Sequence, residues 1–196
     1  AITEAAKNYP EQQFALIDAV CEGEQPENVT SLLFEDNASA YLTGLIAGRM
    51  TETNKVGFIG GMESPVISKF DYGFRAGVKA ANPDAEVMVQ YANSFTDSAL
   101  GKTIANQMHS KNADIIFTCA GAVGIGAIEA AKENGKKAIG VDQDQNALAP
   151  KNVITSAMKN IDVAVVELLS KVVDGSYKGG EVIINTLAMN GVGIPQ

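Results

Sequence analysis

Short apolar runs alternate with longer amphipathic segments along most of this chain, and this alternation constrains the fold more than any other feature. The apolar runs predict strands at 13–18, 29–34, 55–60, 85–91, 114–118 and 137–141. The amphipathic segments predict helices at 1–8, 37–50, 64–82, 97–110, 125–134 and 160–174. Strands that alternate with helices in this way are typical of a parallel sheet covered on both faces, so the sequence predicts an α/β fold.

The composition is that of a folded protein that does not bind nucleic acid. Of the 196 residues, 46% are hydrophobic and 19% are charged, which is enough apolar surface to bury a core in one large or two small domains. The formal net charge is -8, and no cluster of Lys or Arg offers a basic face to phosphates. No apolar run approaches the length of a membrane span, and residues 1–6 lack a signal-peptide pattern.

The same pattern predicts two lobes, of which only one is complete. The polar stretch 51–54 separates the helix 37–50 from the next strand, and a boundary is expected there. We therefore expect a partial N-terminal lobe at 1–54, a central α/β lobe at 55–150, and a return segment to the first lobe at 151–196. The chain begins inside a helical segment and ends without a closing element, so a truncated chain is expected. Apolar faces left uncovered could promote self-association.

Two carboxylates and a lysine are the strongest candidates for a binding site. Asp142 and Asp144 follow directly after the predicted buried strand 137–141. The carboxyl ends of parallel strands form the ligand-binding edge of an open α/β sheet, which favours acidic residues placed there. A carboxylate can accept hydrogen bonds from both vicinal hydroxyls of a ribose, and Lys159 can donate to the same oxygens if the loop 143–154 folds back. Alternatively, Lys159 is an exposed lysine that opens the helix 160–174, and Asp144 only caps its loop.

The small-residue loop 119–124 and two aromatic residues are further candidates. Ala120 and Gly121 let the backbone approach a ligand closely at the start of a helix, or they serve only helix-to-sheet packing. Phe70 and Phe117 are the aromatic side chains considered for stacking on a flat base. Phe70 also lies on the apolar stripe of its own helix, so a role in the core is equally open.

Other chemistries find no support in the sequence. The stretch TDSALGKT (96–103) has threonine where a phosphate-binding loop needs its first glycine, and the glycines near 121 do not match a dinucleotide fingerprint. His109 is the only histidine, with no second histidine for a zinc site, and no GxSxG motif is present. Cys21 and Cys119 are far apart and predict two buried thiols. We expect no cofactor, no metal and no enzymatic activity.

Several stretches together carry a resemblance to a known family. They are GFIGGMESPVISKFDYGFRAGVKAANPDAEV (57–87), SFTD (94–97), DIIFTCAGAVG (114–124), GVDQDQNALAP (140–150) and TSAMK (155–159). In this order they resemble the basic membrane protein (BMP) family of ABC-transporter substrate-binding lipoproteins, most of all its purine nucleoside receptors. The resemblance covers nearly the whole chain. It implies a type I periplasmic-binding-protein fold with two hinged α/β lobes, one complete here and the other partial.

The resemblance also implies a function and its residues. Asp142 and Lys159 would be ribose ligands, the turn at Ala120 and Gly121 would lie against the base, and Phe70 would be the stacking ring. The full-length parent would be the extracytoplasmic, lipid-anchored component of an ABC importer that binds a nucleoside, with a membrane permease as its partner. The alternatives are a regulatory effector-binding protein of the same fold and a sugar-binding receptor.

Overall fold

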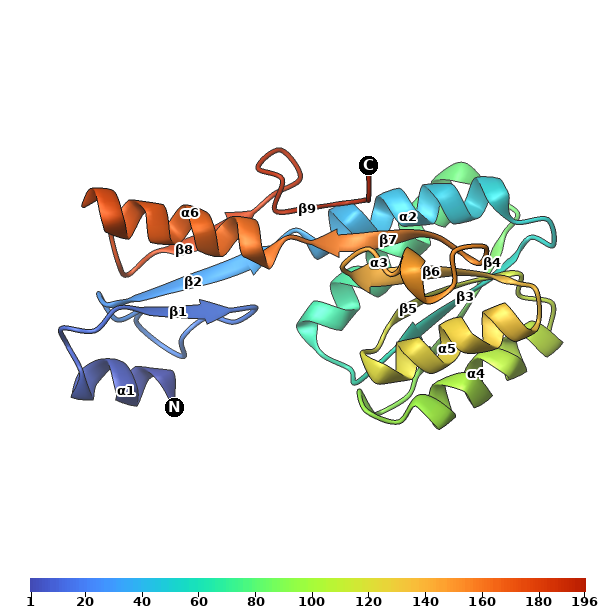
Figure 1. Cartoon of the computed structure of the whole chain (residues 1–196), viewed down its shortest axis with the longest axis horizontal. Coiled ribbons are helices and arrows are strands. Elements are labelled where there is room, and N and C mark those ends of the chain that lie inside the picture. Colours follow the sequence, from blue (N-terminus) through green and yellow to red (C-terminus); the bar gives the residue numbers. More distant parts are fainter. The chain divides into compact units, whose positions relative to one another are not determined.

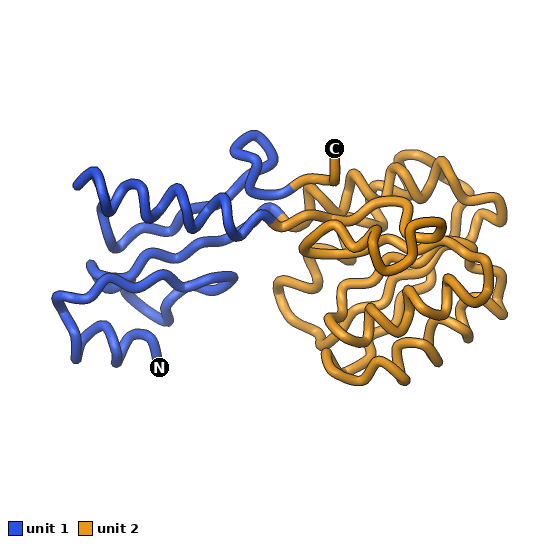
Figure 2. Tube along the Cα trace, viewed as in Figure 1, with its two compact units in different colours: residues 1–35, 160–192 blue, residues 36–159, 193–196 orange.

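The computed structural model describes all 196 residues and divides them into two compact units, shown in Figure 2. Unit 1 comprises residues 1–35 and 160–192, and unit 2 comprises residues 36–159 and 193–196. The boundaries differ from the predicted 54/55 and 150/151. The helix at 36–50 belongs to the central lobe because it packs on another helix of that lobe, and 153–159 belongs there because it forms a strand of its sheet.

Unit 1 is a small parallel sheet with a helix from each end of its sequence (Figure 1). Its strands are β1 (Phe14–Ile17), β2 (Val29–Phe34) and β8 (Val182–Asn185), in the order β1-β2-β8. Helix α1 (Ile2–Asn8) contributes Ala6 to an apolar cluster with Cys21 and Val29. Helix α6 (Ile161–Asp174) ends at Gly175, whose left-handed backbone is a common helix terminator.

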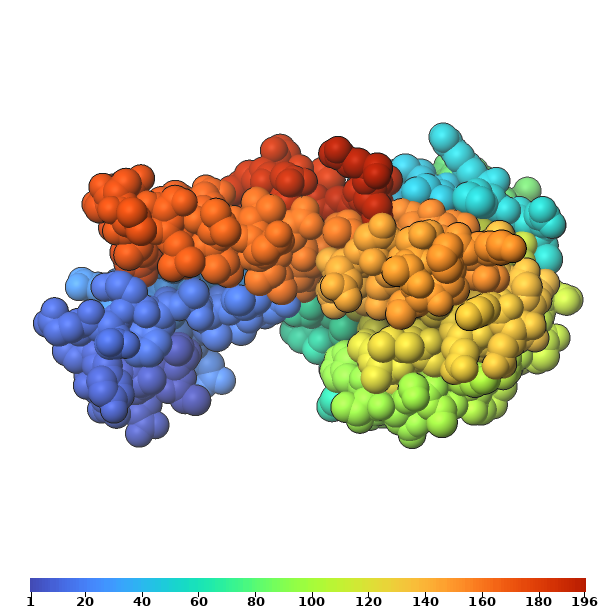
Figure 3. All heavy atoms as spheres, viewed as in Figure 1, coloured from blue at the N-terminus to red at the C-terminus, as the bar shows by residue number.

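Helix α6 buries one narrow stripe and leaves a second apolar face exposed. Ala164 and Leu168 are its buried residues. The space-filling view in Figure 3 shows this helix on the surface, where four large apolar side chains remain accessible: Val166, Leu169, Val172 and Val173. No helix of the chain combines the length and the apolar content that crossing a membrane requires.

Unit 2 contains the larger sheet, whose strands have the order β4-β3-β5-β6-β7-β9. The pairs from β4 to β7 are all parallel, which confirms the predicted α/β class. The strands are β3 (Lys55–Gly60), β4 (Glu86–Tyr91), β5 (Ile115–Cys119), β6 (Lys137–Asp142), β7 (Val153–Lys159) and the short β9 (Val192–Gly193). The helices are α2 (Asp36–Met50), α3 (Pro65–Ala81), α4 (Ser98–Ser110), α5 (Ala122–Glu133) and the 3-10 turn η1 (Asn146–Leu148).

Strand β7 was not predicted, and its presence changes the position of Lys159. The segment VITSAMK mixes polar and apolar residues, so it lacks the unbroken apolar run by which the other strands of this sheet were identified. It pairs with β6 in parallel and places Lys159 at its last position. Lys159 therefore ends a strand and does not open a helix, because α6 begins at Ile161.

Two helix pairs cover the large sheet, and within each pair the backbones are in close contact at glycines. Helix α2 packs on α3, and α4 packs on α5, as Figure 1 shows. A side chain at Gly44 or Gly77 would overlap the backbone of the facing helix, and the same holds for Gly101 and Gly126 in the other pair. Four rings from α3, β3 and β5 form the aromatic centre of the core: Phe58, Phe70, Phe74 and Phe117. This rigid packing holds the strand ends where the candidate site lies.

Candidate ligand-binding site

The carboxyl edge of the large sheet is the natural place for a ligand in unit 2. From β3 the chain first runs to β4 on one side and then crosses to β5 on the other, so the connections after β3 and β5 diverge at this edge. Such a topological switch point leaves a crevice outside the strand ends. Here the Gly61 N–H donates to Cys119 O at 3.0 Å, and the Asn93 N–H donates to Gly61 O at 2.9 Å. The loops after three neighbouring strands are therefore tied together.

Asp142 ends β6 at this edge with an unusual backbone. Its φ of 66° lies in the left-handed region, which aspartate tolerates better than most residues. The residue is exposed, and it lies opposite Met158 in the register of β6 and β7. Sparsely populated backbone conformations that persist at a cleft edge are often associated with function. Lys159 is therefore the residue after the register partner of Asp142 on the adjoining strand.

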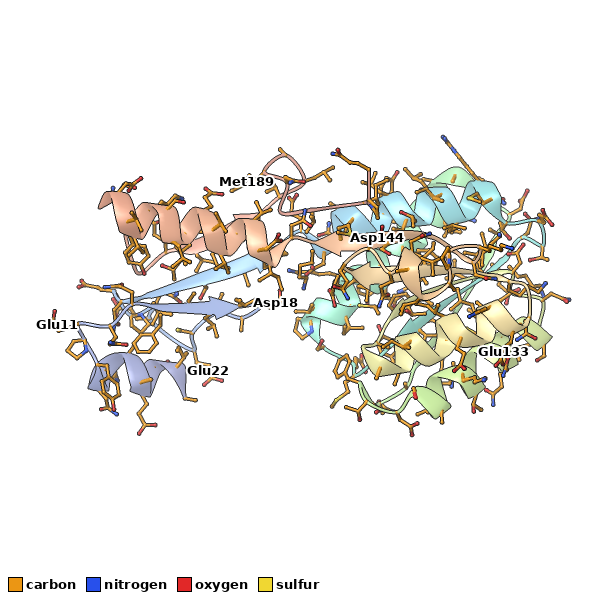
Figure 4. All side chains as sticks on the ribbon, viewed as in Figure 1. Glu11, Asp18, Glu22, Glu133, Asp144 and Met189 are labelled. Carbon is orange, nitrogen blue, oxygen red and sulfur yellow. The ribbon has the colours of Figure 1, made fainter.

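Asp144 has a local role in the loop that follows. Figure 4 labels it between β6 and β7, and its Oδ1 accepts a hydrogen bond from the Asn146 N–H at 3.0 Å. Such a bond, two residues along the chain, is the side-chain turn that aspartate commonly forms. The neighbouring Gln145 fixes the loop to both strands: its Oε1 accepts from the Val141 N–H at 3.0 Å, and its N–H donates to Ser156 Oγ at 3.1 Å. The geometry favours the loop-capping alternative for Asp144.

Lys159 is buried beside a carboxylate that the sequence analysis did not consider. Its Nζ lies 3.1 Å from Asp36 Oδ1, and the two side chains are 4% and 1% exposed. The ammonium also lies 5.5 Å from the centre of the Phe70 ring, within the range of a cation–π interaction. The alternative of an ordinary exposed lysine is therefore wrong. The cost of burying the ammonium is offset by an opposite charge and an aromatic face.

The loop after β5 is shaped by Gly121. Its φ of 57° and ψ of -128° form a combination open almost only to glycine, and an added Cβ would lie 2.8 Å from Phe95 O. Helix α5 begins at Ala122, three residues earlier than predicted, and the Ala122 N–H donates to Phe95 O at 2.8 Å. Ala120 is 1% exposed. Gly121 is accordingly the accessible member of this pair of candidates.

The aromatic ring at this edge is Phe95, and neither Phe70 nor Phe117 is accessible. Phe70 is 1% exposed and Phe117 is 0% exposed, because both belong to the aromatic centre of the core. Phe95 is 39% exposed in the loop after β4, and its ring lies against the Cα side of Gly61. A ring held on one face by backbone and open to solvent elsewhere suits stacking on a flat ligand.

Asp36 and Phe95 are the residues that the sequence analysis missed. Asp36 stands between a predicted strand and a predicted helix, which is the usual position of a helix-capping residue and gave no signal for a site. Phe95 lies in the SFTD stretch, which was noted only for its resemblance to the family. Both assignments depend on tertiary contacts: Asp36 meets Lys159 from a distant strand, and Phe95 meets the turns after β3 and β5.

The weaker motifs have structural roles. Residues 98–103 lie in helix α4, where Lys102 forms an ion pair with Glu133 at 2.7 Å, so the stretch forms no phosphate-binding loop. His109 is buried, its Nδ1 lies 2.9 Å from Ala113 O, and burial lowers the pKa of this imidazole. No group of three or more His, Cys, Asp or Glu side chains is arranged to hold a metal ion. Both cysteines are buried, and neither forms a disulfide.

Known proteins resemble this chain over its whole length. The family described as Bmp, ABC transporter substrate-binding protein PnrA-like, matches residues 1–196. The "ABC transporter nucleoside-binding protein BmpA" of Lactococcus lactis subsp. cremoris is 41% identical over 98% of this chain and 59% of its own length. The chain thus spans about three-fifths of that relative.

Solved structures confirm the solute-binding fold. An ABC transporter solute-binding protein from Aeropyrum pernix K1 superposes with a TM-score of 0.90 at 33% identity, over 98% of this chain and 56% of that one. A transcriptional activator of the comK gene from Bacillus halodurans superposes with a TM-score of 0.88 at 26% identity, over 100% of this chain and 66% of that one.

Proposed function

Because the chain belongs to the Bmp family of PnrA-like ABC transporter substrate-binding proteins, as its motifs predicted, we propose that the longer protein binds a purine nucleoside for import. The observation that carries the proposal is the pair Asp142 and Lys159, which end neighbouring strands at the carboxyl edge of the sheet. The name of the Lactococcus lactis relative, a nucleoside-binding protein, supports the ligand class. The family consists of binding proteins and not of enzymes.

The chemistry of the pair fits a ribose. Vicinal hydroxyls can donate two charge-assisted hydrogen bonds to the Asp142 carboxylate, and an ammonium can donate to the same hydroxyl oxygens from the adjoining strand. Gly121 would let the nucleoside approach the start of helix α5 closely. We propose that the second lobe of the longer protein closes over the ligand about a hinge. Only the closed form would then present both lobes together to an ABC permease.

The proposal is tested by calorimetric titration of the full-length parent with guanosine, inosine, adenosine, cytidine and ribose. We expect saturable binding of purine nucleosides, with ribose alone bound weakly because it lacks the base. Tight binding of ribose by itself would establish the sugar-receptor alternative. No heat with any of the five compounds would contradict the nucleoside assignment.

Phe95 supplies a separate prediction about the base. In the full-length parent, Phe95→Ala is expected to weaken purine nucleoside binding about tenfold, since an aromatic stacking pair contributes about 1 kcal/mol beyond its buried area. Phe95→Tyr should bind almost as well as the wild type. Tyr72→Ala is the control, because Tyr72 is 64% exposed on α3 and contacts Arg75 instead. Equal affinities for the wild type and Phe95→Ala would exclude stacking by this ring.

A regulatory role is the second candidate, and one comparison favours it. The Bacillus halodurans activator shares the fold at 26% identity. An effector-binding domain would use the same carboxyl-edge site but would be joined to a transcriptional function and lie in the cytoplasm. The transport proposal instead requires the longer protein to be extracytoplasmic and lipid-anchored. Globomycin-sensitive processing of the expressed parent would support the transport role, and a cytoplasmic parent would support the regulatory role.

The 196-residue chain alone is expected to bind a nucleoside weakly or not at all. It contains about three-fifths of the length of its Lactococcus lactis relative, and a partial site loses the preorganisation that limits the entropy cost of binding. The exposed apolar face of α6 is where the self-association expected from the sequence would take place. Sedimentation velocity of the isolated chain tests this, and a monomer at all concentrations would contradict it.

A further inference from the structure

We infer that Asp36 is a positioning residue for ligand binding: its carboxylate holds the Lys159 ammonium at the carboxyl edge of the sheet. Asp36 is the first residue of helix α2, and Lys159 is the last residue of strand β7. Their charged atoms lie 3.1 Å apart although 122 residues lie between them in the chain. The inference rests on the proposed role of Lys159 and adds a residue that does not itself touch the ligand.

The surroundings of the pair restrict where the ammonium can lie. The Asp36 side chain is 1% exposed, so solvent cannot screen its charge effectively. Phe70 lies beneath the ammonium at 5.5 Å from its ring centre, and this ring is itself fixed against Phe117 in the core. A flexible lysine is thereby held by a carboxylate and an aromatic face. A lysine held in this way loses little side-chain entropy when a ligand binds.

Asp36 is itself held firmly by its helix. A negative charge in the first turn of α2 is favoured by the helix dipole. The Nζ of Lys69 on α3 lies 3.9 Å from Asp36 Oδ2 and provides a second positive charge, and Lys69 is 39% exposed. Because α2 packs on α3, the carboxylate has a fixed position relative to the sheet. The carboxylate can therefore orient Lys159 before any ligand arrives.

Asp36 and Lys159 both lie at boundaries between the two units in the chain. The chain passes between the two units after Glu35 and again after Lys159. The ion pair thus joins the two points at which these connections reach unit 2. Loss of the Asp36 carboxylate would remove a charged contact of the Lys159 ammonium at the end of β7, so the placement of Lys159 is expected to change.

The test is calorimetric titration of the full-length parent with inosine and with 2′,3′-dideoxyinosine. Asp36→Asn keeps the shape of the side chain and removes its charge. We expect inosine to bind about tenfold to a hundredfold more weakly, because a misplaced ammonium loses a charge-assisted hydrogen bond to the ribose. The same variant should bind 2′,3′-dideoxyinosine as the wild type does, since that ligand lacks both hydroxyls. A merely structural role would weaken both ligands alike and would overturn the inference.

The double variant Asp36→Asn/Lys159→Met tests the coupling even where the single variant is too unstable to titrate, since it removes both buried charges. Its affinity for inosine should equal that of Lys159→Met alone, and a further loss would overturn the inference. Asp71→Asn is the matched control, because Asp71 is also buried and ion-paired, to Arg75 at 2.7 Å. It should lower the melting temperature without changing the ratio of the affinities for inosine and 2′,3′-dideoxyinosine.

The outcomes distinguish this inference from the proposed function. If the wild type binds inosine, and Lys159→Met weakens binding while Asp36→Asn does not, the result contradicts the positioning role of Asp36 and leaves the proposed function intact. If the wild type binds no nucleoside, the proposed function falls and the inference falls with it. If Asp36→Asn weakens the binding of inosine tenfold or more and leaves the binding of 2′,3′-dideoxyinosine unchanged, the result supports both the proposed function and the role of Asp36.

Discussion

Gly77→Ala is expected to lower the free energy of unfolding by about 2–3 kcal/mol, the upper range for overpacking a well-packed interior. In an exposed helix the same exchange would be stabilising by about 1 kcal/mol, so the expected sign is reversed here. An added Cβ would overlap Tyr41 O and would lie 2.9 Å from Leu45 N and 3.0 Å from Gly44 Cα, all on helix α2. Backbone atoms cannot rotate away as side chains can, so the two helices must separate.

The measurement is thermal unfolding of the chain followed by circular dichroism, with an expected fall in the melting temperature of roughly 5–10 °C. Ala76→Gly is the matched control, because Ala76 is the exposed neighbour on the same helix and should cost only about 1 kcal/mol of helix propensity. A Gly77→Ala variant that melts at or above the wild-type temperature would show that α2 and α3 are not in close backbone contact.

Asp142→Asn in the full-length parent is expected to weaken purine nucleoside binding by about 10- to 100-fold, which corresponds to about 1.5–3 kcal/mol for hydrogen bonds to a charged group. Asparagine keeps the tolerance for the left-handed backbone at φ 66°, so the change removes the charge without straining the end of β6. Asp142→Ala should weaken binding at least as much, because it also removes the acceptor oxygens.

Asp84→Asn serves as the control for this prediction. Asp84 is exposed in the turn that leads into β4, at the opposite edge of the sheet, and its removal changes the net charge by the same amount. Binding is measured by calorimetry at fixed ionic strength, since long-range electrostatics would otherwise contribute. Affinity of either Asp142 variant within a factor of two of the wild type would exclude the ribose contact.

The sequence predicted those parts of the fold that depend on local patterns. The unbroken apolar runs at β3, β5 and β6 identified buried strands, and the regular stripe of α3 identified a helix, because burial of a strand or a helix face leaves a characteristic spacing. Strand β7 was missed because it mixes polar and apolar residues. The boundary at 54 was misplaced because a polar turn looks alike whether it separates two domains or two elements of one domain.

The candidate site shows the same division. Asp142 could be placed at the end of a strand from its neighbours in sequence, and the parallel sheet then put it at the carboxyl edge, where open α/β sheets commonly bind ligands. The burial of Lys159, its partner Asp36 and the exposed Phe95 ring could not be predicted, because each depends on segments far apart in the chain that meet only after folding. Phe70 fitted both a core stripe and a clamp, and only its 1% exposure decided between them.

By itself, therefore, the sequence determined the α/β class, the family and the carboxylate at the end of β6, since these follow from local periodicity and from the order of motifs. The tertiary structure alone decided which ring is accessible, which lysine is buried and which carboxylate holds it. The physical reason is that burial and ion pairing are properties of atoms brought together from distant positions, and no local pattern records those distances.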